Sequence, residues 1–167
     1  EDWALLLNGV NKIVDMPLYI DDTCSLSPGE IRERVGMLAS GMDIGLIVID
    51  YLQILNVESS GNPIKDACRS LKIMAMEFNV PVVVLSQLNR KVDTRVCKQP
   101  RLSDLRGDDS IEEIADVVIF LYRDEMYNPE TKHKGRAEII IAKQKLGLTA
   151  NIYVLWDPLS LTFRTLC

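Results

Sequence analysis

The sequence is poor in the residues and runs that mark several common classes of protein. Its 167 residues include one histidine and four cysteines, and no two cysteines are spaced as Cys-x-x-Cys. These residues are too few and too scattered for a zinc site, and they favour a reduced, cytoplasmic setting. No apolar run approaches the roughly 20 residues that a membrane-spanning helix needs. The first residues also lack the basic start and cleavage site of a signal peptide. We therefore expect a cytoplasmic protein without a membrane partner.

Basic residues are also in the minority, since 19 lysines and arginines stand against 24 acidic residues and give a net charge of −5. This balance argues against a uniformly basic surface for nucleic acid. The distribution is uneven, because residues 90–106 hold six basic side chains against two acidic ones. This segment has no apolar periodicity, so we expect an exposed loop that is either simply solvated or able to meet phosphates.

Apolar periodicity predicts a single α/β domain over residues 1–167. Ser27 with Glu30 and Ser110 with Glu113 have the spacing of capping boxes at helix starts. We expect helices over residues 3–14, 28–38 and 64–78, and strands over residues 18–21, 45–50, 81–86, 115–123, 137–144, 150–157 and 161–166. The alternation of strands and helices, followed by strands with short turns, predicts a mostly parallel sheet flanked by helices with antiparallel C-terminal strands.

The interior of this domain can also be predicted. The strands at 45–50 and 81–86 are continuously apolar, so we expect helices to cover both of their faces. Met74 and Met76 are expected to pack within the helix over residues 64–78.

Three apolar strands end in polar residues, namely Asp50, Ser86-Gln87 and Arg123-Asp124. Strand ends in a parallel sheet face one crevice, so these groups are candidates for a common site. An aspartate there can hold Mg²⁺, usually through water, and Gln87 can orient a water or sense a phosphate. Spacing alone leaves open the alternative that these strands merely end at polar loops.

Four longer stretches narrow this choice: GLIVIDYLQIL (45–55), NVPVVVLSQLNR (79–90), RLSDLRGDDSIEEIADVVIFLYRDE (101–125) and AEIIIAKQKLG (137–147). In wording, order and spacing they closely resemble the ATPase domain of the DnaB-type replicative DNA helicases, from about residue 20 to the end of the chain. The resemblance implies a RecA-like P-loop NTPase core, ATP and Mg²⁺ as cofactors, and a ring of six identical subunits. It further implies 5′ to 3′ movement along single-stranded DNA, with a primase and a helicase loader as partners in bacterial or phage replication.

The resemblance also assigns roles to individual residues. Asp50 matches the Walker B aspartate that organises Mg²⁺, and Gln87 matches a glutamine that couples the γ-phosphate to the DNA-binding loops. Lys143 and Lys145 match positions that reach the nucleotide of the neighbouring subunit. The loop that touches the backbone of single-stranded DNA is matched by Arg106, Gly107, Asp108, Asp109 and Ser110.

The chain departs from the family pattern in three places. It contains no Gly-Lys pair and hence no phosphate-binding P-loop, and the family's catalytic glutamate lies upstream of the matched region. We expect that the N-terminal part of the domain is missing and that the chain alone neither binds ATP tightly nor hydrolyses it. Lys145 stands where the family usually has an arginine, whose planar fork can span two phosphate oxygens. Asp109 replaces a glycine and should repel DNA.

Two other functions remain open at this point. A non-catalytic relative acting in ring assembly or DNA binding is consistent with the absent P-loop and the altered loops. A phospho-receiver domain would use Asp21, Asp22, Asp50 and Ser86 as an acidic pocket. The short gap between Asp22 and Asp50, and Arg123 where a receiver needs lysine, argue against it.

Overall fold

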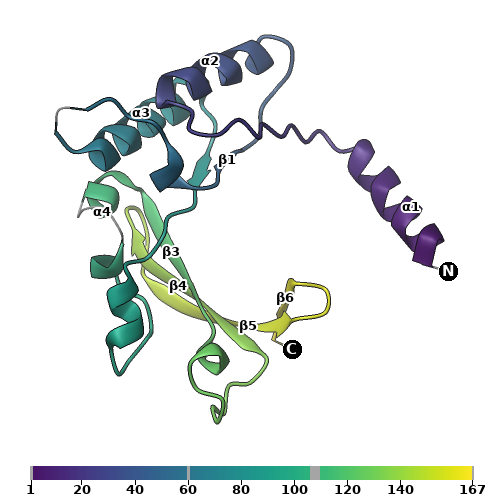
Figure 1. Ribbon diagram of the computed structural model, residues 1–167, viewed down its shortest axis with the longest axis vertical. Coiled ribbons are helices and arrows are strands. Elements are labelled where there is room, and N and C mark those ends of the chain that lie inside the picture. Colours follow the sequence, from purple (N-terminus) through teal and green to yellow (C-terminus); the bar gives the residue numbers. More distant parts are fainter. Residues whose placement is uncertain (1, 60, 106–109, 167) are drawn as a thin grey trace.

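The computed structural model describes residues 2–59, 61–105 and 110–166, which form helices and two sheets (Figure 1). The first sheet is a parallel pair of strands, β1 and β2. The second has four antiparallel strands in the order β3-β4-β5-β6. The helices are α1 (Asp2–Val14), α2 (Pro28–Ala39), α3 (Pro63–Phe78) and α4 (Ser110–Ile114), and the strands are β1 (Ile47–Ile49), β2 (Val82–Val84), β3 (Val117–Tyr122), β4 (Arg136–Gln144), β5 (Ala150–Asp157) and β6 (Thr162–Thr165). The α/β class with added antiparallel C-terminal strands is thus confirmed.

Local chemistry explains where the two central helices begin and end. Ser27 Oγ accepts a hydrogen bond from the backbone N of Glu30, and the Glu30 carboxylate accepts one from the backbone N of Ser27, so the first capping box is confirmed. At the start of α3 the Asn62 side chain accepts from the backbone N of Lys65. The same helix ends at Asn79, which adopts the left-handed conformation common after a helix C-terminus.

The main core lies where α2 and α3 meet the parallel pair. In Figure 1 both helices lie beside β1, at the end of the molecule away from β5 and β6. Their apolar side chains close over one face of the pair, and removal of this surface from water stabilises the arrangement. The buried members of this cluster are Val35, Ile49, Leu52, Ala67, Leu71, Met74 and Ile111.

Burial of the parallel strands on both faces is a wrong prediction for the described part of the chain. Val48 of β1 is 57% exposed and Val83 of β2 is 49% exposed, while Ile49 beside them is buried. In β3 the same alternation leaves Ile119 and Leu121 exposed. Both central helices pack on one side of the pair, so every second side chain of these strands faces away from the core.

Two further predictions of local structure are wrong. Residues 18–21 form no strand, because their backbone has no partner strand among the described residues. Asp21 instead accepts a hydrogen bond from the backbone N of Thr23 and pairs with Arg34 of α2. Met76 does not pack within α3, since it is 64% exposed, whereas Met74 is 1% exposed.

No helix in the described ranges is long and apolar enough to cross a membrane.

Candidate functional site

The carboxyl ends of the two parallel strands are joined through their backbones. Leu85 N donates to Ile49 O at 2.9 Å, and Leu52 N donates to Leu85 O at 2.8 Å. These two hydrogen bonds lie on either side of Asp50, which is exposed and directly follows β1. The segment that carries Asp50 is therefore fixed beside the segment that carries Gln87, as the strand ends predict.

A residue that the sequence reasoning missed joins these two segments. The Gln53 side chain donates from Nε2 to Ser86 Oγ at 2.9 Å and accepts at Oε1 from the backbone N of Gln87 at 3.2 Å. A primary amide can do both at once because it carries donors and an acceptor. The signal was available in the motif Asp-Tyr-Leu-Gln, where a glutamine follows a strand end within a few residues.

The third strand end does not join this site. Arg123 pairs with Glu125, and Asp124 accepts hydrogen bonds from the hydroxyls of Tyr122 and Thr131. These residues close the far end of the antiparallel sheet, where β3 runs on to a short 3₁₀ turn (Figure 1). Convergence of all three strand ends in one crevice is not seen among the described residues, where β3 pairs with β4 in a separate sheet from β1 and β2.

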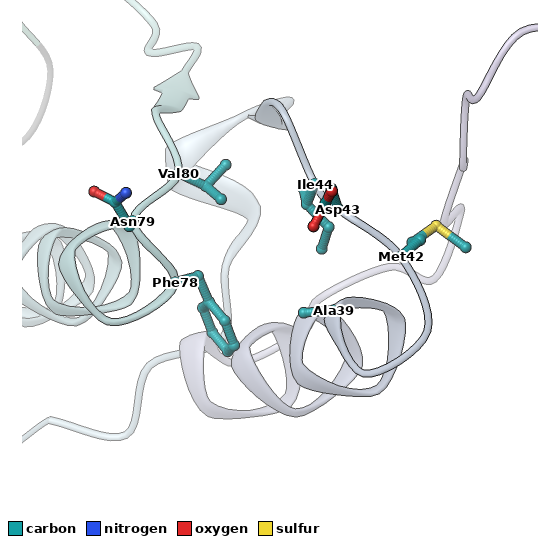
Figure 2. Close-up of a pocket in the computed structure, with 7 residues that line it drawn as sticks. All are labelled: Ala39, Met42, Asp43, Ile44, Phe78, Asn79 and Val80. Carbon is teal, nitrogen blue, oxygen red and sulfur yellow. The ribbon is translucent and has the colours of Figure 1, made fainter.

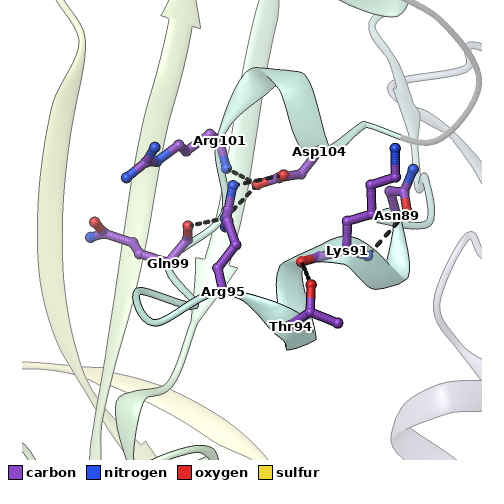
Figure 3. A network of polar contacts seen from close by, with 7 residues as sticks. All are labelled: Asn89, Lys91, Thr94, Arg95, Gln99, Arg101 and Asp104. Atoms are coloured by element: carbon purple, nitrogen blue, oxygen red, sulfur yellow. Dashed lines mark hydrogen bonds and ion pairs between the residues drawn. The ribbon is translucent and has the colours of Figure 1, made fainter.

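The basic segment after Gln87 contains regular structure, and at its centre the half-buried Arg95 forms an ion pair with the buried Asp104 (Figure 3). Arg95 donates from Nη1 and Nη2 to the two carboxylate oxygens of Asp104 at 2.9 and 2.7 Å, and Asp104 is 5% exposed. Arg101 N also donates to Asp104, and Gln99 O accepts from Arg95. Arg95 is thus a structural cation, and the segment contains two 3₁₀ helices, at Arg90–Thr94 and Leu102–Asp104.

This network brings the Gln87 segment to the stem of the loop predicted to bind DNA. Leu88 and Leu105 form an antiparallel bridge, and Asn89 N donates to Asp104 O at 2.7 Å. Arg106, Gly107, Asp108 and Asp109 lie outside the described residues.

On the far side of that loop, Ser110 is the first residue of α4 and is 2% exposed. Its hydroxyl has no hydrogen-bond partner within the described ranges, so the capping box expected with Glu113 is not seen there.

The two lysines predicted to act across a subunit boundary have different surroundings. Lys143 of β4 is half-buried, and its Nζ donates to the backbone O of Glu112 and, at 3.4 Å, to that of Glu113. Lys145 is exposed, and its backbone N donates to Asp116 O at 2.8 Å.

Asp116 itself forms an ion pair with a cation of α3. The hydrogen bond from the Lys72 ammonium holds the pKa of the Asp116 carboxyl below its usual range, with smaller contributions from the charges of Lys145 and Lys143. The junction of α4 and β3 therefore gathers three lysines around one carboxylate.

A separate hollow of about 380 Å³ lies at the opposite edge of the parallel pair (Figure 2). Its walls come from the end of α2 and the residues before β1, including Ala39 and Asp43, and from the end of α3, including Phe78. Ligands of open α/β sheets bind at the carboxyl ends of the strands. This hollow is at the amino ends, so it is not the counterpart of the Asp50 site.

The donor set at the Asp50 edge suits a particular kind of metal site. The described ranges contain no cluster of three or more histidine, cysteine, aspartate or glutamate side chains that could enclose an ion. Mg²⁺ in nucleotide-binding proteins commonly keeps several waters and is held by one or two carboxylates together with phosphate oxygens. An exposed Asp50 fits a hydrated Mg²⁺ that arrives with a nucleotide.

Polar groups at the carboxyl ends of parallel strands are common to many open α/β folds. Solved structures assign this chain to the RecA-like class. One of them, determined as an ATPase domain, superposes with a TM-score of 0.93 at 32% identity, over 99% of this chain and 61% of that chain. A DnaB-like replicative helicase, determined for its interactions with primase, superposes with a TM-score of 0.93 at 33% identity over 99% of this chain and 42% of that chain.

Sequence comparison identifies the family. The model of the DnaB-like helicase C terminal domain matches residues 1–165, and the chain belongs to that family. It is 43% identical over 152 residues to the replicative DNA helicase DnaB of Geobacillus stearothermophilus, covering 88% of this chain and 34% of that protein. It is 41% identical over 152 residues to the replicative DNA helicase DnaC of Bacillus subtilis, with the same coverage.

Two consequences follow from the comparisons. The chain spans about one third of the length of these relatives. The phospho-receiver alternative is wrong, because the family match covers nearly the whole chain and the fold ends in an antiparallel sheet.

Proposed function

We propose that this chain is the C-terminal part of the ATPase domain of a replicative DNA helicase that couples ATP hydrolysis to 5′ to 3′ movement along single-stranded DNA. The observation that carries the proposal is the pairing of the Asp50 and Gln87 segments through Gln53 at the carboxyl edge of β1 and β2. In a member of the DnaB-like family, this edge is where a magnesium nucleotide would bind.

The proposed roles follow from the chemistry of each group. Asp50 holds the hydrated Mg²⁺, which supplies charge neutralisation on the phosphates. Gln87 orients the attacking water and responds to the γ-phosphate, and Gln53 keeps its backbone in place. Phosphoryl transfer relies on such positioning and charge stabilisation rather than on covalent intermediates. The phosphate-cradling loop and the catalytic glutamate are not in this sequence, and we infer that residues outside the chain supply them.

Coupling to DNA follows the backbone contacts after Gln87. The Leu88–Leu105 bridge carries any movement of the Gln87 segment to the stem of the loop at residues 106–110. We assign Arg106, Gly107, Asp108 and Asp109 to contacts with the sugar-phosphate backbone. Such contacts give little sequence preference and a steep decrease of affinity with salt. Asp109 is expected to weaken this contact. Ser110, predicted as a fifth contact, is 2% exposed and is instead proposed to anchor the end of the loop.

The partners proposed for the whole protein are five further copies of itself, single-stranded DNA, a primase and a helicase loader. Lys143 and Lys145 would reach the nucleotide of the adjacent copy in a six-membered ring. The primase is supported by the similar helicase whose structure was determined for its interactions with primase. We place this assembly in the cytoplasm, in bacterial or phage replication.

Strand displacement by the full-length protein tests the proposal. A forked DNA with a single-stranded 5′ tail on the encircled strand should be unwound when ATP and Mg²⁺ are present, and a substrate with only a 3′ tail should not. A full-length protein that binds DNA and assembles into rings, but unwinds neither substrate and hydrolyses no ATP, would instead be the non-catalytic relative.

A further inference from the structure

Lys143 makes an intramolecular contact that its predicted role across the subunit boundary does not require. Its side chain leaves β4 and reaches the C-terminal turn of α4, where Nζ donates to the backbone O atoms of Glu112 and Glu113. The β4 backbone at this point is paired with Val118 of β3, so the position of the lysine is fixed by the sheet.

The contact is favourable for an elementary reason. The last carbonyl groups of a helix have no intrahelical partner and carry the negative end of the helix dipole. A lysine ammonium donates hydrogen bonds to these carbonyl groups, and its positive charge interacts favourably with the negative end of the dipole. The helix α4 is five residues long, so contacts of this kind account for much of its stability.

The same short helix carries the end of the loop predicted to bind DNA. Ser110 is both the last residue of that loop and the first of α4, and Ile111 is anchored in the main core. Glu113 forms an ion pair with Lys65 of α3 at 3.5 Å. Because α4 is little more than one turn long, a shift of its C-terminal turn would also move Ser110 at its start.

The two contacts of Lys143 draw on the same ammonium group. Nζ is half-buried and donates to two carbonyls of α4, which leaves one of its three N–H groups, so a pull on it from a phosphate outside the chain would weaken its contact with α4. Lys145 makes no such contact with α4. Its side chain is exposed, its backbone N donates to Asp116 O, and its charge makes only a minor contribution to the lowered pKa of the Asp116 carboxyl.

The geometry points to Lys143 as a latch, a positioning residue that holds α4, including Ser110 at its start, while no nucleotide is bound across the boundary and releases the helix when one is. This inference rests on the proposed function, because the phosphate that would bind Lys143 belongs to a nucleotide of a neighbouring subunit of the ring. It makes the two lysines inequivalent: Lys145 acts on the nucleotide alone, and Lys143 also couples nucleotide binding to the position of α4 and Ser110.

Amide hydrogen exchange of the full-length protein tests the latch, read in peptides that span residues 110–117. Without nucleotide or DNA, Lys143→Met should speed exchange in α4 by about tenfold, the loss expected for one charge-assisted hydrogen bond. Lys145→Met is the matched control, with the same change of charge two residues away, and should leave α4 at the wild-type rate. Lys143→Arg, which keeps a charged donor, should restore protection. Unchanged exchange in Lys143→Met, or an equal rise in Lys145→Met, overturns the latch.

A second arm adds a non-hydrolysable ATP analogue with Mg²⁺. Exchange in α4 should rise in the wild type toward the rate of Lys143→Met, and that variant should show no further rise. A wild type that hydrolyses ATP but keeps α4 equally protected with and without the analogue overturns the release. A protein that hydrolyses no ATP contradicts the proposed function, whereas the nucleotide-free comparison of the two variants still decides whether the resting contact exists.

Discussion

Gln53 sets the position of Gln87: its side-chain amide accepts a hydrogen bond from the Gln87 backbone N at 3.2 Å and donates one to Ser86 Oγ at 2.9 Å. The two parallel strands are thus joined beyond their own ladder by a residue of the Asp-Tyr-Leu-Gln motif. In the proposed mechanism, Gln87 acts through its placement, and that placement depends on Gln53.

Replacement of Gln53 should therefore slow catalysis without removing a group that touches the nucleotide. We expect Gln53→Ala to lower the rate of ATP hydrolysis by the full-length protein by about a hundredfold, the effect of a small misplacement at a reacting centre. Ser86→Ala removes one of the two hydrogen bonds and should have a smaller effect. Wild-type turnover in Gln53→Ala would show that Gln87 is positioned by other contacts.

The ion pair between half-buried Arg95 and buried Asp104 should hold the stem of the DNA loop. Asp104→Asn leaves the guanidinium without its counter-charge, and we expect the free energy of local opening of residues 88–105 to fall by about 3 kcal/mol. Native-state hydrogen exchange measures this quantity. The exposed acid of the same segment supplies the control, since Asp93→Asn should change it by no more than about 0.5 kcal/mol. Equal effects of the two variants would contradict a structural role for the pair.

The segment after β3 should loosen in acid. Hydrogen bonds from the hydroxyls of Thr131 and Tyr122 lower the pKa of Asp124 from its ordinary value. A bond from the Gly135 backbone N, followed by one from Arg123, lowers the pKa of Glu125. Because these folded-state pKa values are depressed, the stabilisation is complete above the unfolded values near roughly 4 and is lost as the pH falls through the folded values.

Hydrogen exchange in residues 122–135 should accordingly be as slow at pH 5 as at pH 7, after correction for intrinsic rates, and should rise below about pH 4. Asp124→Asn should remove part of that rise. Loosening that begins between pH 7 and pH 6 would contradict this assignment, because neither carboxylate titrates there.

Two methionines of α3 provide a paired test of the core. Met74 is buried and Met76 is exposed, although the chemistry of their side chains is identical. We expect Met74→Ala to reduce the free energy of opening of α3 by about 2 to 5 kcal/mol, and Met76→Ala to change it by less than about 0.5 kcal/mol. Comparable losses in the two variants would place a covering surface over Met76 in the full-length protein.

Much of the fold could be predicted because local signals and packing agree. Ser27 and Glu30 fix the start of α2 through a reciprocal pair of bonds within one turn, and the sequence shows both partners. The antiparallel strands follow from apolar alternation and short turns. By contrast, whether Val48 and Val83 are covered depends on what packs against their face, and no local pattern records that.

In the site, too, some features could be predicted from the sequence and others depend on tertiary contacts. The placement of Asp50 beside the Gln87 segment could be expected because Asp50 directly follows β1 and Gln87 follows β2 within three residues, and parallel strands end at the same edge of a sheet. The exclusion of Arg123 and Asp124 could not, because it depends on β3 pairing with β4. The contacts of Gln53 and Lys143 join residues 30 or more positions apart and end partly on backbone atoms, which carry no signature in the sequence.

The central claim is that Asp50 organises the magnesium nucleotide, and ATP hydrolysis by two aspartate variants of the full-length protein tests it most directly. Asp50→Asn, at the carboxyl end of β1, should lower the rate by about a hundredfold or more, on the order of the loss of one preorganised electrostatic group. Asp43→Asn, an exposed acid before the same strand, should hydrolyse ATP at the wild-type rate. Equal activity of the two variants, at any Mg²⁺ concentration, would contradict the account.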